Sequence, residues 1–315
     1  MLVLGLLSVI VAVQAAWIDA SPAPSSKPLA VTAVIAPPYV WECSGQPLPE
    51  NCISASFDGN TTHVKGFLVD LLKKLAEKGN FRYEVHLRKD GRYGYKDPNS
   101  ASGWTGMIGE LIKNEADLAL APFTVTDERT EVVSFTTPFS EQIGLSVLLK
   151  KPISTQSSTC VFCTKEKMMI PFSNEDDLSM QAAIKYGVLA GGSVYRFFQN
   201  SQVDPYKKMW SFMSAHPEKS FVNNTKDGID RVRTSQGRFA FIMEKPAVHF
   251  VSSQIPCDTV AIDFDRKDYN TKGYSLALPV GSAWTETLSR LIDELQTNGS
   301  IVAMYDQWWK STECV

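Results

Sequence analysis

The stretch "GFLVDLLKKLAEKGNFRYEVHL", residues 66–87, contains the patterns of a helix and a strand in direct succession. Apolar residues recur at the i, i+3, i+4, i+7 spacing of one helical face, and Gly79 with Asn80 forms a stop signal, which predicts a helix ending there. From Phe81 to Leu87 every second residue is apolar, as in a half-buried strand. A helix that leads at once into a strand favours an α/β fold.

The same alternation extends in both directions from this stretch. Residues 151–182, rich in Ser, Thr, Lys and Pro, interrupt it and mark a boundary between two blocks. Because each block alternates strands with helices, we predict the α/β class with a largely parallel sheet in each block. The further elements predicted are strands at 29–35, 116–122, 184–192 and 238–243, and helices at 106–114, 193–201 and 227–236, with two C-terminal helices broken at Asn298-Gly299.

Length and charge narrow the classes of function. A chain of 315 residues favours two domains or a single two-lobed unit. The 31 basic side chains are matched by 34 acidic ones, for a net charge of −3, so there is no basic field to attract nucleic acid or anionic lipid. We therefore expect no nucleic-acid partner.

The first 28 residues have the pattern of a secretory signal followed by a linker. An apolar run ends in small residues near position 15, so we predict a signal peptide at 1–16, with a retained membrane anchor as the alternative, and a Pro/Ser linker at 17–28. The run is about 15 residues, shorter than the roughly 20 of a membrane span, and no other segment approaches that length. We expect a secreted, extracellular protein without a membrane span. Three glycosylation sequons fit secretion, although such triplets also arise by chance: Asn60, Asn223 and Asn298.

Six cysteines in a secreted chain indicate disulfide bonds, with fifteen possible pairings. Cys43 and Cys52 bracket a short polar loop, and the Cys160-x-x-Cys163 pair lies in the polar stretch, which leaves Cys257 and Cys314 for each other. A CxxC can also be a redox or zinc motif, but no second CxxC or histidine pair lies near it. We expect structural disulfides, no metal site and no cofactor.

Polar residues at the end of the strand predicted at 116–122 are candidates for a ligand site, because ligands of open α/β sheets bind at the carboxyl ends of strands. Pro122 offers a carbonyl, Thr124 a hydroxyl, and Arg129 a fork that matches a carboxylate. Together they suit the head group of an amino acid. The alternative is that Arg129 pairs with Glu131 or Asp127 on a solvated turn and that Thr124 caps a helix.

The second block offers matching groups. The strand at 184–192 ends in Gly191-Gly192 and runs directly into a helix at Ser193, so the free backbone N–H groups at the start of this helix point toward a bound anion. The alternative is that Ser193 serves only as the N-cap of the helix. Glu244 ends an apolar strand, where its carboxylate could offset a ligand ammonium. A surface ion pair with Lys245 is the alternative for Glu244.

The order of these motifs resembles the ligand-binding core of ionotropic glutamate receptors across about residues 29–315. The resemblance is carried by "GFLVDLLKKLA", "GWTGMIGELIKNEADLALAPFTVTDERTEVVSFTTPF", "YGVLAGGSVYRFF", "FAFIME", "KGYSLALPVGS" and "WWKSTEC". It implies a two-lobed clamshell of the periplasmic binding protein type II kind. The implied bounds are 29–146 plus 273–305 for lobe 1 and 147–272 plus 306–315 for lobe 2, with a linker at 151–178 in place of the receptor pore helices.

The resemblance also implies roles for single residues. Arg129, with Thr124, would clamp the ligand α-carboxylate, and Ser193 would close on it from lobe 2. The Pro122 carbonyl, the Thr124 hydroxyl and Glu244 would hold the ammonium. The remaining implied features are Tyr93 as the aromatic roof of the pocket, Tyr274 near the hinge, and a Cys257–Cys314 disulfide that ties the chain end to lobe 2.

Two departures from the family pattern shape the expected function. The polar linker replaces the pore helices, so we expect no channel activity of its own. Val194 lacks the hydroxyl that glutamate-selective members place there and resembles the glycine-binding or D-serine-binding members. Met243 and Glu244, however, depart from the glycine type, so glutamate and the glycine or D-serine type of ligand both stay open. In addition, Ala36 replaces an acid that locks the lobes together in some members.

We therefore expect a secreted, soluble amino-acid-binding protein that closes on its ligand. The alternative is an interaction or decoy module for full-length receptor subunits, and a homodimer is a further possibility. No catalytic residue is expected, because no arrangement in the sequence resembles a catalytic dyad.

Overall fold

The computed structural model describes residues 27–45, 47–140, 143–151, 170, 172–269, 273–309 and 314. The predicted signal peptide, most of the predicted linker at 17–28 and the Cys160-x-x-Cys163 pair lie outside the described residues.

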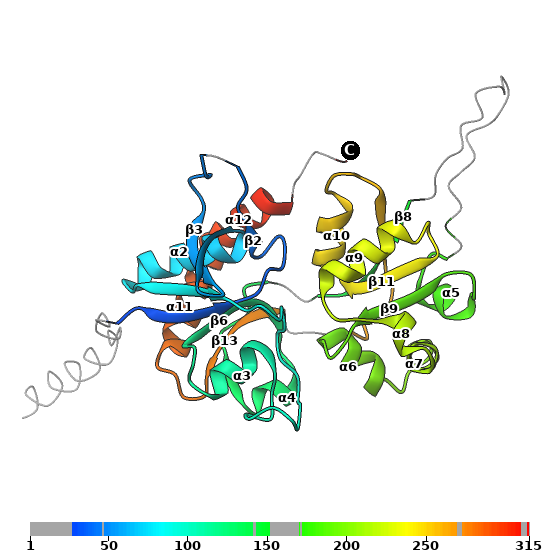
Figure 1. Cartoon of the computed structure of the whole chain (residues 1–315), viewed down its shortest axis with the longest axis horizontal. Helices are drawn as coiled ribbons and strands as arrows, with labels where there is room; N and C mark the ends of the chain where they lie inside the picture. The colour runs from blue at the N-terminus through cyan, green and yellow to red at the C-terminus, as the bar shows by residue number, and fades with distance from the viewer. Residues whose placement is uncertain are drawn as a thin grey trace, which may run out of the picture.

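The described strands form two separate sheets, and each sheet is the centre of one lobe (Figure 1). The sheet of lobe 1 has the order β2 (Trp41–Glu42), β4 (Asn60–Lys65), β3 (Ile53–Phe57), β5 (Tyr83–Leu87), β1 (Leu29–Ala33), β6 (Leu118–Thr124), β13 (Tyr274–Pro279) and β7 (Val133–Phe135). The sheet of lobe 2 has the order β10 (Phe221–Val222), β9 (Lys185–Leu189), β11 (Phe239–Glu244), β8 (Leu145–Lys150) and β12 (Thr259–Asp263).

Helices cover both faces of the lobe 1 sheet. Strand β6 is buried along its whole length because alternate residues face opposite layers: Leu118 and Leu120 enter one core, and Ala119 and Phe123 the other. The first face packs against α2 (Phe67–Gly79), α11 (Trp284–Thr297) and α12 (Ser300–Trp309), and the second against α3 (Gly106–Ile112), with α4 (Asp127–Thr130) following β6.

The helix that opened the sequence analysis forms as predicted. Leu68, Leu71, Leu72 and Leu75 of α2 are all fully buried in the lobe 1 core, and the chain leaves the helix through Asn80 in the left-handed conformation (φ 48°). The break between α11 and α12 also occurs where predicted, at Asn298-Gly299.

Lobe 2 repeats the layered arrangement around its smaller sheet. Along β11, Ala240 and Ile242 face one core while Phe241 and Met243 face the other. The first core is closed by α5 (Glu175–Met180), α6 (Ser193–Asn200) and α7 (Tyr206–Ala215), and the second by α9 (Thr225–Thr234) and α10 (Lys245–Ser252); the short α8 (Pro217–Ser220) precedes β10.

Three details differ from the sequence-based expectation. We expected a mixed, mostly parallel sheet flanked by helices in each lobe; both sheets are mixed and flanked by helices, but parallel pairs do not predominate, because the hairpin β3–β4 and the returning strands β8 and β13 pair antiparallel with their neighbours. Part of the expected linker, 172–178, is packed in lobe 2, since Phe172 and Leu178 are buried in its core. The expected lobe boundaries at 146 and 305 fall inside β8 and α12.

The chain passes between the lobes from β7 to β8 and again from β12 to β13. A third link is the Cys257–Cys314 disulfide, which joins the segment after α12 to the loop after α10. This topology places the ends of β6 and β11 on the same cleft. Among the described residues, no helix has the length and apolar character needed to cross a membrane.

Candidate ligand-binding site

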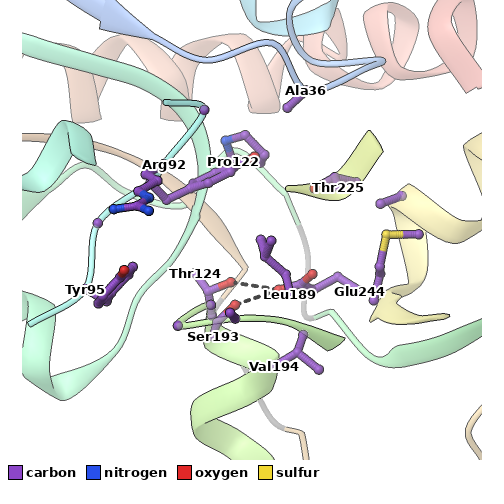
Figure 2. A pocket seen from close by; sticks show the side chains of 18 of the residues that line it. Ala36, Arg92, Tyr95, Pro122, Thr124, Leu189, Ser193, Val194, Thr225 and Glu244 are labelled. Carbon is purple, nitrogen blue, oxygen red and sulfur yellow. Dashed lines mark hydrogen bonds between the residues drawn. The ribbon is translucent and has the colours of Figure 1, made fainter. Parts of the chain in front are cut away.

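A cavity of about 110 Å³ lies between the lobes, where the end of β6 faces the start of α6 and the end of β11 (Figure 2). Its walls come from both lobes, so a molecule held there would contact both. Every residue predicted for the ligand site lines it: Pro122, Thr124, Arg129, Ser193, Val194, Glu244, Tyr93 and Tyr274.

Arg129 is a buried cation on the lobe 1 wall. Its side chain is held by two backbone carbonyls, with Nη1 donating to Thr124 O at 2.9 Å and Nη2 to Gly94 O at 3.2 Å, and the guanidinium lies 5.4 Å from the centre of the Phe123 ring. The residue is only 5% exposed, and this burial lowers the pKa of the guanidinium from its usual value. The arrangement fixes the fork while leaving N–H groups for a ligand.

The surface ion pair considered for Arg129 is not formed. Glu131 pairs with Lys96 at 3.3 Å instead. Of the carboxylates in the described part of the chain, none lies within 4 Å of the Arg129 nitrogen atoms. A buried arginine without an acidic partner is costly unless an anion neutralises it, so this position fits a carboxylate ligand.

Glu244 is the acidic counterpart on lobe 2. Its Oε1 accepts hydrogen bonds from Ser193 Oγ at 2.7 Å, Tyr269 Oη at 3.1 Å and Thr124 Oγ1 at 3.4 Å. Two of these bonds are drawn in Figure 2, and the one from Thr124 crosses between the lobes. The helix cap considered for Thr124 is therefore not its role in the structure.

The ion pair considered between Glu244 and its neighbour in sequence is also not formed. Lys245 Nζ lies 2.5 Å from Asp263 Oδ2, and His249 Nε2 lies 2.7 Å from Asp263 Oδ1. Among the described residues no cation lies within 4 Å of the Glu244 carboxylate. Glu244 thus fits an ammonium supplied by a ligand.

The start of α6 differs from the expectation that Ser193 caps the helix. The N-cap residue is Gly192, and α6 begins at Ser193, whose hydroxyl donates to Glu244 rather than capping. The preceding Gly191 has φ of +69°, and a Cβ added to it would lie 2.6 Å from Cδ1 of Tyr95 in lobe 1. The two lobes are therefore in close contact at this turn.

Three residues shape the rest of the cavity: Pro122, Tyr93 and Tyr274. Pro122 lies within β6, which extends to Thr124, two residues beyond the end predicted for this strand. Tyr93 packs edge-to-face on Phe123 with ring centres 5.6 Å apart, and Tyr274, 3% exposed, packs in the same manner on Tyr39. Burial raises the pKa of both Tyr93 and Tyr274, so these phenols are neutral at ordinary pH.

The sequence reasoning missed several residues of the site. Tyr269 was missed because the segment before it, "FDRKDY", has no periodic pattern and no motif. Tyr95 directly follows the "GRYG" motif but makes its contact with Gly191 across the cleft, which no local pattern can indicate. Further lining residues that were not singled out include Arg92, Leu189, Thr225 and Ala247.

Of the described cysteines and sequon asparagines, only Asn223 lines the cavity. The structure pairs Cys43 with Cys52 and Cys257 with Cys314. The side chains of Asn60, Asn223 and Asn298 are exposed, and Asn223 also lines the rim of the cavity. No group of three or more potential metal ligands is found within the described ranges.

Comparison with known proteins agrees with this geometry. Residues 27–153 match the family described as "Ligated ion channel L-glutamate- and glycine-binding site". Over 90% of its length the chain is 27% identical to a glutamate receptor of Lymnaea stagnalis, covering 41% of that receptor. The chain is a homologue of the glutamate receptors.

Other relatives give the same result. Human glutamate receptor 3 is 25% identical over 90% of the chain, covering 42% of the receptor, and the mouse "Glutamate receptor ionotropic, kainate 5" is 27% identical over 92%, covering 38%. The chain thus spans about two fifths of the length of these relatives. The alignment to the Lymnaea receptor, 388 positions, exceeds the 315 residues of this chain, so that receptor has segments within the aligned region that this chain lacks.

Proposed function

We propose that this glutamate-receptor homologue is an extracellular amino-acid-binding protein whose two lobes close on the α-amino and α-carboxyl groups of the ligand. One observation carries the proposal. Arg129 on lobe 1 and Glu244 on lobe 2 face the same cavity, and neither has an oppositely charged partner within 4 Å among the described residues. A zwitterionic head group would neutralise both charges at once.

The proposed roles follow from the geometry. Arg129 grips the ligand carboxylate bidentately, assisted by Thr124 and by Ser193 with the N–H groups at the start of α6. The Pro122 carbonyl, the Thr124 hydroxyl and Glu244 bind the ammonium. Tyr93 covers the ligand, and Tyr274 supports the cavity from the hinge side.

The end of the cavity beside α6 favours a small or uncharged ligand side chain. Val194 is 5% exposed, and its side chain offers no hydrogen-bond donor; Leu189 and Met243 are further apolar residues that line the cavity. Figure 2 places Arg92 and Tyr95 away from Val194 and Glu244, and the Arg92 guanidinium lies 5.9 Å from the Tyr95 ring centre. We therefore propose glycine or D-serine ahead of glutamate as the ligand.

Closure is proposed to occur about the two chain crossings near residues 146 and 272. The proposed lobes comprise 29–146 with 273–305 and 147–272 with 306–315. The boundaries at 146 and 305 are moved to the ends of β8 and α12, so that neither element is divided between the lobes. Contacts formed only in the closed state, such as Thr124 to Glu244, would supply the free energy of closure.

The setting of this activity is part of the proposal. The predicted signal peptide and the exposed sequon asparagines at 60, 223 and 298 support secretion with glycosylation. The chain would bind its ligand without channel activity, since the alignment shows internal receptor segments that it lacks. We propose no enzymatic activity, because the relatives are receptors.

A second candidate is an interaction or decoy module for full-length receptor subunits. It is favoured by the homology to receptors over 90% of the chain. A homodimer, in which two copies of this chain pair with each other in place of a receptor subunit, is a further form of this candidate. This candidate predicts co-purification with receptor subunits that survives loss of Arg129.

A thermal-shift titration of the purified chain tests the main proposal. Glycine, D-serine, L-serine, L-alanine, L-aspartate and L-glutamate are added separately, because a ligand that binds only the folded state raises the melting temperature. We expect a shift with glycine or D-serine. Folded protein that shows no shift with any of the six would contradict the proposal and favour the interaction module.

A further inference from the structure

We propose that Tyr269 is a positioning residue of the amino-acid site, whose hydroxyl holds one oxygen of Glu244 so that the other faces the ligand ammonium. This inference rests on the proposed function. It concerns a residue outside the cavity wall that acts on the ligand through Glu244.

The hydrogen bonds of Glu244 are divided unequally between its two oxygen atoms. Oε1 accepts from Ser193, Tyr269 and Thr124, whereas Oε2 has no donor among the described residues. A carboxylate oxygen has about two lone-pair sites, so three hydroxyl donors occupy Oε1 fully. Oε2 is the oxygen left for an ammonium.

Tyr269 differs from the other two donors in what else it can contact. Ser193 and Thr124 line the cavity and can turn their hydroxyls to a bound ligand. Tyr269 is not among the residues that line the cavity, and it is 7% exposed. Its hydroxyl therefore stays on Glu244 when the ligand recruits the other two, and it then becomes the donor that fixes the carboxylate.

The phenol is held firmly in place by the lobe 2 core. Its ring packs edge-to-face on Phe197 of α6, with centres 5.2 Å apart and planes at 86°. Phe197 lies on the same helix as Ser193, so Tyr269 and the start of α6 are fixed relative to each other. Burial raises the pKa of the Tyr269 phenol well above its usual value, so the phenol keeps its proton and remains a donor at ordinary pH.

A second buried carboxylate anchors the segment that leads to Tyr269. Glu175 of α5 is fully buried, and its Oε2 and Oε1 accept the backbone N–H groups of Asp265 at 3.0 Å and Arg266 at 2.8 Å. Arg266 also pairs through Nη2 with Asp176 at 3.0 Å. Burial of Glu175 is tolerated only because these donors satisfy it, so the same contacts fix the path of the segment four residues before Tyr269.

Other charged and polar groups surround Glu244. The groups that interact electrostatically with it from lobe 1 and the hinge are Tyr39, Tyr93, Arg129 and Tyr274. Its neighbour Lys245 is paired with Asp263. The hydroxyl donors stabilise the carboxylate that attracts the ammonium, so removal of one donor is expected to weaken binding.

The test is Tyr269→Phe in the full chain, with Tyr186→Phe as the matched control. Tyr186 is an equally buried lobe 2 tyrosine that packs on Phe212 and does not contact Glu244. Glycine, D-serine and L-glutamate are titrated calorimetrically against each protein, and the melting temperature of each protein is measured without ligand. We expect Tyr269→Phe to weaken binding roughly tenfold while its melting temperature without ligand stays close to that of Tyr186→Phe, whereas a merely structural role would lower the melting temperature. Tyr186→Phe should match the unmodified protein.

The outcomes separate the inference from the proposed function. If the unmodified chain binds none of the three ligands, both are wrong. If it binds and Tyr269→Phe has the same affinity, or loses affinity only together with a lower melting temperature without ligand, only the inference is overturned. Glu175→Gln provides an independent check that leaves Tyr269 in place: we expect about threefold weaker binding, and unchanged affinity would overturn the anchoring step.

Discussion

Replacing Arg129 by lysine tests the head-group site most directly. The guanidinium has five N–H donors and uses two of its nitrogen atoms on the carbonyls of Thr124 and Gly94. A lysine ammonium has three donors, so if it keeps both carbonyls, one donor remains for the ligand where arginine offers a bidentate pair. At least one charge-assisted hydrogen bond to the ligand is lost.

The expected size of the effect follows from that count. A hydrogen bond to a charged group contributes about 1.5–3 kcal/mol, which corresponds to a loss in affinity of roughly ten- to 150-fold. Because a point charge on a flexible stem also fails to reproduce the fixed fork, we expect Arg129→Lys to lie at the upper end and to abolish binding in practice.

The assay is calorimetric titration with the amino acid that gives the largest thermal shift. The matched control is Arg92→Lys, because Arg92 is an exposed arginine that lines the same cavity and packs over Tyr95. We expect the control to stay within about threefold of the unmodified protein, as is usual for exposed substitutions. Folded Arg129→Lys protein with an affinity equally close to that of the unmodified protein would refute the reasoning.

Three further variants test other parts of the structure. Val194→Thr adds a hydroxyl to the end of the cavity beside α6, so we expect the affinity ratio of glutamate to glycine to rise roughly tenfold in competition titrations; an unaltered ratio would argue against a selectivity role for this position. Gly191→Ala should weaken binding, because the new Cβ would lie 2.6 Å from the ring of Tyr95 across the cleft. The control Gly192→Ala should not, because its Cβ would lie 3.4 Å from its nearest neighbour. Equal ligand affinities of the two variants would show that closure does not depend on the contact between Gly191 and Tyr95. Leu72→Ala should lower the free energy of unfolding by about 2–5 kcal/mol in denaturant titration while leaving ligand selectivity unchanged, since Leu72 is fully buried in the core of lobe 1 and does not line the cavity.

The sequence predicted the parts of the site that depend on local patterns. Strand β6 is recognisable from its apolar run, and the rule that ligands bind at strand ends draws attention to Thr124 and to Arg129 shortly after it. Glu244 is found by the same reasoning at the end of β11. These residues can be predicted because a strand and its end are properties of a few consecutive residues.

The features that the sequence did not predict depend on distant contacts. Ser193 has the sequence pattern of a helix cap, but Gly192 is the cap residue, and the Ser193 hydroxyl donates to the Glu244 carboxylate, which β11 brings to 2.7 Å from it. The antiparallel pairing of β8 and β13 depends on where the chain returns after crossing between the lobes. Tyr269 was missed for the same reason, since its partner Glu244 lies 25 residues away in sequence.

The division of charge between the lobes explains how binding can drive closure. Arg129 belongs to lobe 1 and Glu244 to lobe 2, so a zwitterion bound to one lobe alone satisfies only one of its charges. In the proposed closure, the second charge would be neutralised when the other lobe arrives, and the contact from Thr124 to Glu244 would form in the same movement. A ligand shifts a conformational equilibrium only through its differential affinity for the two states. With each charge on a different lobe, a large part of the free energy of head-group binding is available in the closed state alone, whatever side chain the amino acid carries.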